Sequence, residues 1–570
     1  MTDFLALPQP TPVNNTWAAP VLAAGFALVL GVAAFVLVIR ARRGIRTTSD
    51  FLLADRTIGP GRNALAMVGG GLMYSTVIII AGHVALSGFD AILLLTAFTM
   101  STVLATLIYA GPVRNVGGYT LGDLFALRAR ERSARTASAV LTLVVYTMFM
   151  IAVLASIGLA ASRMFSTSST ASTPFVATVI AVVGAVAILF VYLGGMPGVT
   201  RVLVLKVCLF IVLVAVLSVI IMVKYRMNLF HLLNDAQAKA APNPRGDLLS
   251  PGRLFGKGAT FASHQDPWVH LSKIFSVAAG ALGIPFLFMR FFVATSGRDA
   301  RRSAASASMI AVAFWQCLII LGLGATAILG GKNIGKAWDT RDITLPKLAD
   351  NLGGKWMSGA LGGVALLSVG TLFAVLLLNA VTAVVKDVNA ARGRQLEPAA
   401  ELKSIRRSVV VIGVLSIVVG TALAPLLTHI FIPTAIDLGG TCVLPAVVYS
   451  LFWRRFNTRG LQWTIYGGLA LILLMVVFSN GVSGDPANAM FPHVNFKFID
   501  FEPGLVGVPA GFLLGLIGTL TSRERNDAAF AEMRVRSLTG AVIHARPERP
   551  ATDGALSDRK YQNQALTETH

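Results

Sequence analysis

Thirteen long apolar stretches, separated by shorter polar segments, dominate the chain. A helix needs about 20 predominantly apolar residues to cross a hydrocarbon core about 30 Å thick, and each stretch is close to that length. The pattern therefore predicts an all-α, polytopic membrane protein with thirteen transmembrane spans. The predicted spans are 18–40, 63–86, 91–111, 138–162, 175–194, 202–223, 271–291, 305–330, 357–386, 408–427, 430–453, 461–480 and 503–521.

Positive charge is distributed unevenly between these spans. No Lys or Arg precedes the first span, whereas RARRGIR follows it directly; a cleavable signal peptide would carry its positive charge in front. With the N-terminus outside, 34 of the 48 Lys and Arg fall on the cytoplasmic side, as the positive-inside rule requires. We therefore expect a multi-pass protein of the plasma (inner) membrane, with its N-terminus outside and its C-terminus in the cytoplasm.

The composition mainly excludes other classes of protein. Of the 570 residues 55% are hydrophobic and 13% are charged, which is about half the charged fraction of a soluble chain. The net charge of +21 is explained by cytoplasmic segments beside a lipid bilayer, so no nucleic-acid partner is expected. Three cysteines, Cys208, Cys317 and Cys442, lie inside apolar stretches and show no metal-binding spacing. The sequence does not indicate an oligomeric state.

Two spans contain helix-breaking residues at corresponding places. Span 2 carries Gly69, Gly70 and Gly71, and span 7 carries AAGALGIP, with Gly283 and Pro285 in its middle. Glycine and proline weaken a helix interior, and transporters often bind their cargo where two such helices unwind. The breaks are five spans apart, so the second five-span unit is inverted relative to the first. The alternative is that these glycines only let helices pack closely.

The predicted core is therefore ten helices in two inverted five-helix repeats, with broken helices 2 and 7. This organisation divides the chain into eight segments. They are an extracellular N-terminus (1–17), peripheral span 1 (18–40), a basic cytoplasmic loop (41–62), the first repeat (63–223), a long outer loop (224–270), the second repeat (271–453), peripheral spans 12 and 13 (454–521) and a disordered cytoplasmic tail (522–570).

Several segments between about residues 45 and 480 resemble the sodium/solute symporter family, particularly its cation/acetate and short monocarboxylate permease branch. Their order and spacing match those of the family. The segments are FLLADRTIGPGRNALA at 51–66, IIIAGHVALSGFDAILL at 78–94, RNVGGYTLGDLFALR at 114–128, GGMPGVTRVLVLK at 194–206, GIPFLFMRFFVATSGRDARRS at 283–303 and VLPAVVYSLFWRRFNTRG at 443–460.

The resemblance implies a sodium ion between the break in span 2 and the middle of span 9. The matching ligands are the carbonyl oxygens of Gly69 and Leu72 and the hydroxyls of Ser368 and Thr371, and oxygen ligands suit such a hard cation. Two departures keep proton coupling open. Leu372 follows Thr371 where the family often has a second hydroxyl, and Gly70 stands where this branch usually has aspartate.

Half-helix ends at the two breaks favour a carboxylate substrate. The predicted lining is Ser75, Thr76, Gly283, Ile284 and Phe286, with Asn379 as a further candidate. Apolar surroundings suit a small carboxylate with a short alkyl tail, so we expect a secondary active symporter that imports acetate, propionate or pyruvate with sodium. A symporter for another organic solute, such as an amino acid or a vitamin carboxylate, is the alternative within the same class.

Two ionisable residues are further candidates for a gate or a proton-linked group. Asp437 lies within span 11, and ionisable residues inside a membrane are functional candidates; a solvated aspartate at a helix end is the competing interpretation. Arg290 closes span 7, where we expect it to snorkel to the interface or to guard the inner mouth. No enzyme motif is present, so a multi-span enzyme or a channel is not favoured.

Overall fold

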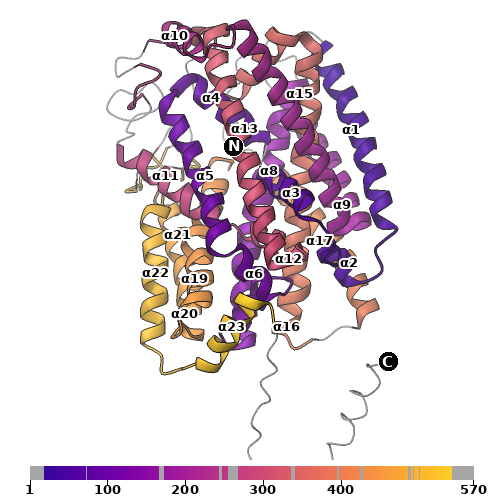
Figure 1. The fold of residues 1–570 in the computed structure, drawn as a ribbon, viewed down its shortest axis with the longest axis vertical. Coiled ribbons are helices and arrows are strands. Elements are labelled where there is room, and N and C mark those ends of the chain that lie inside the picture. The colour runs from indigo at the N-terminus through magenta and orange to yellow at the C-terminus, as the bar shows by residue number, and fades with distance from the viewer. Residues whose placement is uncertain are drawn as a thin grey trace, which may run out of the picture.

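The computed structural model contains helices joined by turns and loops, with no β-strand among the residues that it describes (Figure 1). This confirms the predicted all-α class. The described residues are 18–71, 74–165, 173–242, 247–253, 267–334, 341–394, 397–423, 428–479, 481–484, 489–491, 493–499 and 501–541.

The first half of the chain begins with α1 (Ala18–Arg42) and a short α2 (Thr48–Leu53), which continues into the 3-10 turn η2 (Ala54–Arg56). The helices of the first repeat follow. They are α3 (Pro60–Gly71), α4 (Tyr74–Ser87), α5 (Phe89–Ile108), α6 (Ala110–Val116), α7 (Leu121–Ala126), α8 (Glu131–Phe165) and α9 (Thr173–Lys224).

The second half begins after α10 (Leu229–Lys239). It comprises α11 (Pro267–Leu282), α12 (Pro285–Val293), α13 (Gly297–Leu329), α14 (Gly331–Ile334), α15 (Arg341–Thr382), the π-turn η4 (Ala383–Val388), α16 (Asn389–Ala391), α17 (Pro398–Leu423), α18 (Thr428–Leu438), the π-turn η5 (Gly439–Val443) and α19 (Leu444–Phe452). The last elements are α20 (Thr458–Gln462), the π-turn η6 (Trp463–Gly467), α21 (Gly468–Val477), α22 (Gly504–Leu520) and α23 (Asp527–Thr539).

Ten helices in the described part of the chain are long and apolar enough to cross a membrane. One difference from thirteen is that helix α9 covers both predicted spans 5 and 6; it changes direction at Gly195, whose φ of 47° is accessible to glycine at little cost. Two shorter apolar helices lie at 77–87 and 504–520, and the first adjoins residues outside the described part. The count of thirteen therefore stays a prediction.

Small residues let the peripheral α1 pack closely on the core. A Cβ at Gly359 would lie 2.6 Å from Cβ of Leu22, and one at Gly363 would lie 2.5 Å from Cβ of Phe26. Without a hydrophobic force between helices in lipid, such close backbone approach is a main source of helix association. The helix α1 therefore follows α15 along one edge of the bundle, while α22 lies at the opposite edge (Figure 1).

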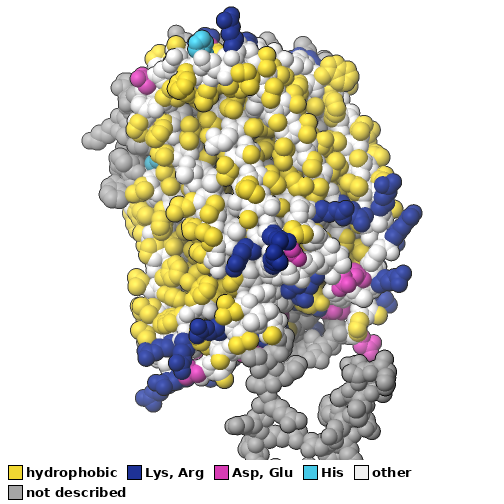
Figure 2. Space-filling model, viewed as in Figure 1, with side chains coloured by type: hydrophobic (Ala, Val, Ile, Leu, Met, Phe, Trp, Pro, Cys, Tyr) yellow, Lys and Arg dark blue, Asp and Glu magenta, His cyan; other side chains and the backbone are white. Residues whose placement is uncertain are grey.

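The surface of the bundle separates apolar from charged side chains. Figure 2 shows a broad hydrophobic face, with most of the visible Lys and Arg gathered toward the end of the molecule that carries α20 and α23. Exposed apolar side chains such as Leu28 and Val29 on α1 are the type of surface that contacts lipid hydrocarbon. The basic end is the one that the charge pattern predicts to be cytoplasmic.

The prediction of a disordered tail was wrong for residues 527–539, which form α23. This helix packs against α6, where the Asn115 amide donates a hydrogen bond to the Ser537 carbonyl at 2.9 Å. Met533 is fully buried, and the Arg128 guanidinium lies 5.0 Å from the ring centre of Phe530. These apolar and cation–π contacts stabilise the helix, which the polar composition of the segment did not predict. Residues 542–570 lie outside the described part.

Candidate functional site

The two predicted helix breaks meet inside the bundle. The second break is observed, because α11 ends at Leu282 and α12 begins at Pro285. Helix α3 ends at Gly71 and α4 begins at Tyr74, and the two residues between them lie outside the described part. A Cβ built at Gly70 would lie 3.7 Å from the Phe286 ring, which is ordinary van der Waals contact. Segments about 215 residues apart in sequence are thus brought together, as a site between two inverted repeats requires.

Close backbone packing positions the second break. A Cβ at Gly283 would lie 1.8 Å from the carbonyl oxygen of Gly439, so only glycine fits there. The Tyr109 hydroxyl donates to the Leu282 carbonyl, a group that the break leaves without a helical partner. Pro285 occupies the first turn of α12, where its missing N–H costs nothing.

The predicted substrate-lining residues fall into two groups. Ile284 and Phe286 lie at the break itself, Ile284 half-buried and Phe286 buried, and the Phe286 ring packs edge-to-face on Phe149 at 6.0 Å. Ser75 and Thr76 belong to α4, but their side chains lie outside what the structure describes. The break therefore presents aromatic surface from α8 and α12.

Asn379 lies in a separate, inner cavity. Its side chain is buried, and neither amide atom has a hydrogen-bond partner among the described residues. The cavity has room for about one water molecule. Its lining is shared by Thr120, Leu121, Thr142, Tyr146, Pro285, Phe288, Met289, Phe292, Asn379, Ala383 and Asp387. Because Pro285 and Phe288 belong to α12, this cavity, which has both polar and apolar lining residues, begins directly beside the second break.

The carbonyl of Gly69, predicted to bind sodium, accepts a hydrogen bond from a lysine. Lys206 Nζ lies 2.8 Å from that oxygen, and the Lys206 side chain is fully buried. This contact of Lys206 was not predicted, because the charge pattern places the residue among the 34 cytoplasmic Lys and Arg. A lysine five residues into the apolar run VLVLKVCLF was the available signal, since intramembrane ionisable residues are functional candidates.

The remaining predicted sodium ligands do not complete a site around Gly69. Thr371 donates its hydroxyl to the Leu367 carbonyl at 2.5 Å within its own helix, and the Ser368 hydroxyl is buried without a partner among the described residues. Leu72 lies outside the described residues. A sodium ion about 4 Å from the Lys206 ammonium would be repelled by about 4 kcal/mol at an effective dielectric constant of about 20. These residues therefore do not fit a sodium ion while Lys206 donates to Gly69.

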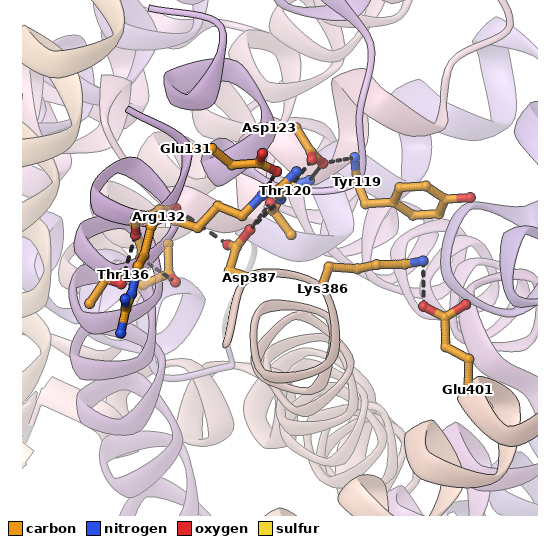
Figure 3. A network of polar contacts seen from close by, with 12 residues as sticks. Tyr119, Thr120, Asp123, Glu131, Arg132, Thr136, Lys386, Asp387 and Glu401 are labelled. Atoms are coloured by element: carbon orange, nitrogen blue, oxygen red, sulfur yellow. Dashed lines mark hydrogen bonds and ion pairs between the residues drawn. The ribbon is translucent and has the colours of Figure 1, made fainter. Parts of the chain in front are cut away.

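An ionic network surrounds Asp387 at the predicted cytoplasmic end of α15 (Figure 3). The Asp387 carboxylate is fully buried; it accepts a hydrogen bond from Thr120 at 2.6 Å and lies 3.3 Å from Arg135 Nη1. Arg135 also pairs with Asp123 at 2.9 Å and with Glu131 at 3.1 Å. The network joins α7, α8 and η4 around the inner cavity.

A second pair supports the same end of the molecule. Lys386 Nζ lies 2.6 Å from Glu401 and 4.3 Å from the centre of the Tyr119 ring, as Figure 3 shows for Lys386 and Glu401. The sequence did not single out Asp387. The acidic and basic residues of LGDLFALRARERSAR at 121–135 indicate a charged cluster, but not that Arg135 would pair with a carboxylate 252 positions away.

Asp437 and Arg290 are both buried inside the protein. Asp437 is 1% exposed, and a Cβ at Gly504 would lie 2.5 Å from its Oδ1 and 2.2 Å from Ser276 Oγ. It therefore packs between α11 and α22 rather than in solvent. Arg290 is 4% exposed and donates to the Thr200 hydroxyl at 2.9 Å. The expectation that Arg290 snorkels was wrong, because a side-chain partner lies within the protein.

Comparison with known proteins identifies the family. The model of the sodium:solute symporter family matches residues 51–468. A monocarboxylic acid transporter of Corynebacterium glutamicum is 32% identical over 536 residues, covering 92% of this chain and 96% of the relative. An uncharacterized symporter of Bacillus subtilis, YwcA, is 28% identical and covers 92% of this chain and 99% of its own.

A solved structure shares the fold. The substrate-bound, outward-open state of a Na⁺-coupled sialic acid symporter superposes with a TM-score of 0.69 at 12% identity, covering 89% of this chain and 98% of the other. At this identity the likeness concerns the arrangement of helices alone. The family model and the 32% identical relative agree with the fold. The chain therefore belongs to the sodium:solute symporter family, whose members are secondary transporters and not enzymes.

Proposed function

We propose that this protein is a secondary active symporter of the plasma membrane that imports a short monocarboxylate, such as acetate, propionate or pyruvate, together with a cation. The observation that carries the proposal is the contact between Gly70 at the first helix break and Phe286 at the second. In a member of this family, that contact marks the meeting point of the two repeats. The monocarboxylic acid transporter of C. glutamicum supports the substrate class.

The chemistry at the two breaks suits such a substrate. The N-terminal turn of α12 begins at Pro285, and free N–H groups at a helix N-terminus favour an anion. The Phe286 ring, which packs on Phe149, makes the surroundings of the second break apolar, as a short alkyl tail requires. A sugar would need several hydrogen-bonding side chains, which the described part of the break does not offer. An amino acid or a vitamin carboxylate is the same-class alternative.

The coupling cation has two candidates. The description of the family and the Na⁺-coupled sialic acid symporter support sodium. Lys206 at the Gly69 carbonyl favours a proton instead, because a fixed ammonium and a sodium ion compete for the same oxygen. The orientation proposed from the charge pattern, with the N-terminus outside, makes cytoplasmic release the last step of import.

Uptake into proteoliposomes tests this function. Radiolabelled acetate, pyruvate and proline are offered with sodium and pH gradients imposed separately, and protein-free liposomes report passive leak. We expect a cation gradient to accumulate acetate and pyruvate but not proline. Accumulation of proline alone would assign the chain to amino-acid transport. Absence of gradient-driven uptake of every carboxylate would refute the proposal.

A further inference from the structure

Asp437 lies where three helices meet. Its side chain is 1% exposed, and it packs between α11, which carries Ser276, and α22, which begins at Gly504. Because Gly504 has no side chain, α22 approaches until the Ser276 hydroxyl and Asp437 Oδ1 both face its backbone. A Cβ there would stand 2.2 Å and 2.5 Å from the two oxygens. These two side-chain oxygens are therefore close neighbours inside the protein.

Three oxygens in this region are buried without a hydrogen bond of regular geometry among the described residues. They are Asp437 Oδ2, Ser276 Oγ and Thr441 Oγ1. Thr441 lies one turn further along the chain, in the π-turn η5, and faces α22 at Gly507, where a Cβ would stand 2.6 Å from its hydroxyl. Buried polar atoms without a partner are uncommon in proteins, and each one requires an explanation.

The Asp437 carboxylate has no cationic partner among the described residues. The groups that face it are the Ser276 hydroxyl, the Gly504 N–H and a second carboxylate, Glu502. Glu502 is half-buried just before α22, and its N–H donates to Ser272 Oγ at 2.9 Å. A buried carboxylate without a counter-ion is costly, and a neighbouring carboxylate adds repulsion. A bound cation would offset both costs.

We propose that Asp437 and Ser276 form the site of the coupling cation and that this cation is sodium; the inference rests on the proposed function. Carboxylate and hydroxyl oxygens suit a hard cation, and one fully buried carboxylate balances one monovalent charge. Thr441 offers a further hydroxyl oxygen. A proton on Asp437 would also cancel the charge, but it could bridge at most two of the three unpaired oxygens. The ammonium that opposes sodium at Gly69 has no counterpart here, because no cationic side chain faces Asp437.

The site is joined to the second helix break. Ser276 lies in the last two turns of α11 before the break. Asp437 is two residues before Gly439, whose carbonyl packs against Gly283 at the break itself. With a cation held by both side chains, Ser276 and Asp437 keep the end of α11 against α18 and pre-organise the break for the carboxylate. Because linkage is reciprocal, the bound carboxylate in turn tightens the binding of the cation.

Sodium binding to the purified protein tests the site without transport. In micelles, NaCl but not choline chloride should raise the midpoint of thermal unfolding of the wild type, because a ligand that binds only the folded state stabilises it. Asp437→Asn should abolish this rise. Ser276→Ala keeps the charge and should raise the sodium concentration for half of the effect by about tenfold, so it tests the site even where Asp437→Asn does not fold.

A buried serine elsewhere provides the matched control. Ser308 on α13 is 6% exposed and donates to the Ala304 carbonyl of its own helix at 2.9 Å. Ser308→Ala removes the same hydroxyl as Ser276→Ala at a place that faces no buried carboxylate. It should leave the sodium dependence of unfolding as in the wild type.

Pyruvate accumulation in proteoliposomes connects the site with coupling. At one sodium per carboxylate, a tenfold inward sodium gradient should drive about tenfold accumulation in the wild type. Asp437→Asn should accumulate no pyruvate. Ser276→Ala should need about tenfold more sodium for the same rate of uptake, whereas Ser308→Ala should match the wild type.

Three results would contradict these proposals. A sodium-dependent rise in the unfolding midpoint that stays unchanged in Asp437→Asn and Ser276→Ala would overturn the site. Wild-type accumulation driven by a pH gradient alone, with no effect of sodium on unfolding, would make a proton the occupant of Asp437 and overturn the sodium assignment. Wild-type protein that binds sodium at this site but neither accumulates nor exchanges any carboxylate would instead refute the proposed function, so the failures are distinguishable.

Discussion

Replacing Arg135 by methionine tests whether the inner ionic network stabilises the molecule. Arg135 bridges Asp123 and the buried Asp387, at 2.9 Å and 3.3 Å, and it is itself only 15% exposed. Methionine retains much of the side-chain volume and removes the charge. The fully buried Asp387 carboxylate then loses its only ion-pair partner among the described residues and keeps two hydroxyl donors, Thr120 at 2.6 Å and Ser138 at 3.4 Å.

The magnitude follows from these contacts. Removing one partner of a buried pair costs about 3–5 kcal/mol, and the short Thr120 bond keeps the loss near the lower end, because a hydrogen bond to a charged group contributes about 1.5–3 kcal/mol. Glu131 is 68% exposed, so its pair adds at most about 0.5 kcal/mol. We therefore expect Arg135→Met to lower the free energy of unfolding by about 3 kcal/mol.

Denaturant unfolding of the purified protein in micelles measures this change. The double variant Arg135→Met/Asp387→Asn removes both charges and should recover to within about 1 kcal/mol of wild type. Arg132→Met, on the same helix but exposed, is the matched control and should change stability by less than about 0.5 kcal/mol. A loss below about 1 kcal/mol for Arg135→Met, or a double variant no more stable than the single one, would refute the reasoning.

Three further predictions concern the helix breaks and the Asp437 carboxylate. Gly283→Ala places a Cβ 1.8 Å from a carbonyl oxygen of the neighbouring span and should abolish pyruvate exchange, whereas Gly71→Ala, with no atom within 4 Å, should retain it. Gly69→Ala meets Val207 at 2.8 Å and should cost about 1–3 kcal/mol on unfolding in micelles; Gly69→Ala/Val207→Ala should recover most of this. Asp437→Asn should change the pH dependence of pyruvate uptake, because an amide cannot exchange a proton; unchanged uptake between about pH 5.5 and 8 would exclude this carboxylate as a proton-linked group.

What the sequence predicted well depends on local chemistry. Span positions follow from runs of apolar residues, and both breaks follow from Gly69–Gly71 and from Pro285, whose effects on a helix need no distant partner. The helix bounds at Leu282 and Pro285 agree with the second break; residues 72 and 73, where the first is predicted, lie outside the described residues. Likewise, because Gly283 has no side chain, another backbone segment can approach it closely. The sequence alone did not identify that segment, which is the Gly439 carbonyl.

What the sequence did not predict depends on contacts between distant segments. Lys206 binds a carbonyl 137 residues away, and Thr120 binds a carboxylate 267 residues away. Hydropathy shows only that each of these residues is polar and lies near or within an apolar stretch; it does not identify the partner. Whether a lysine near a span end reaches water or turns inward depends on the neighbouring helix, and Gly69 provides an unpaired carbonyl at the right distance.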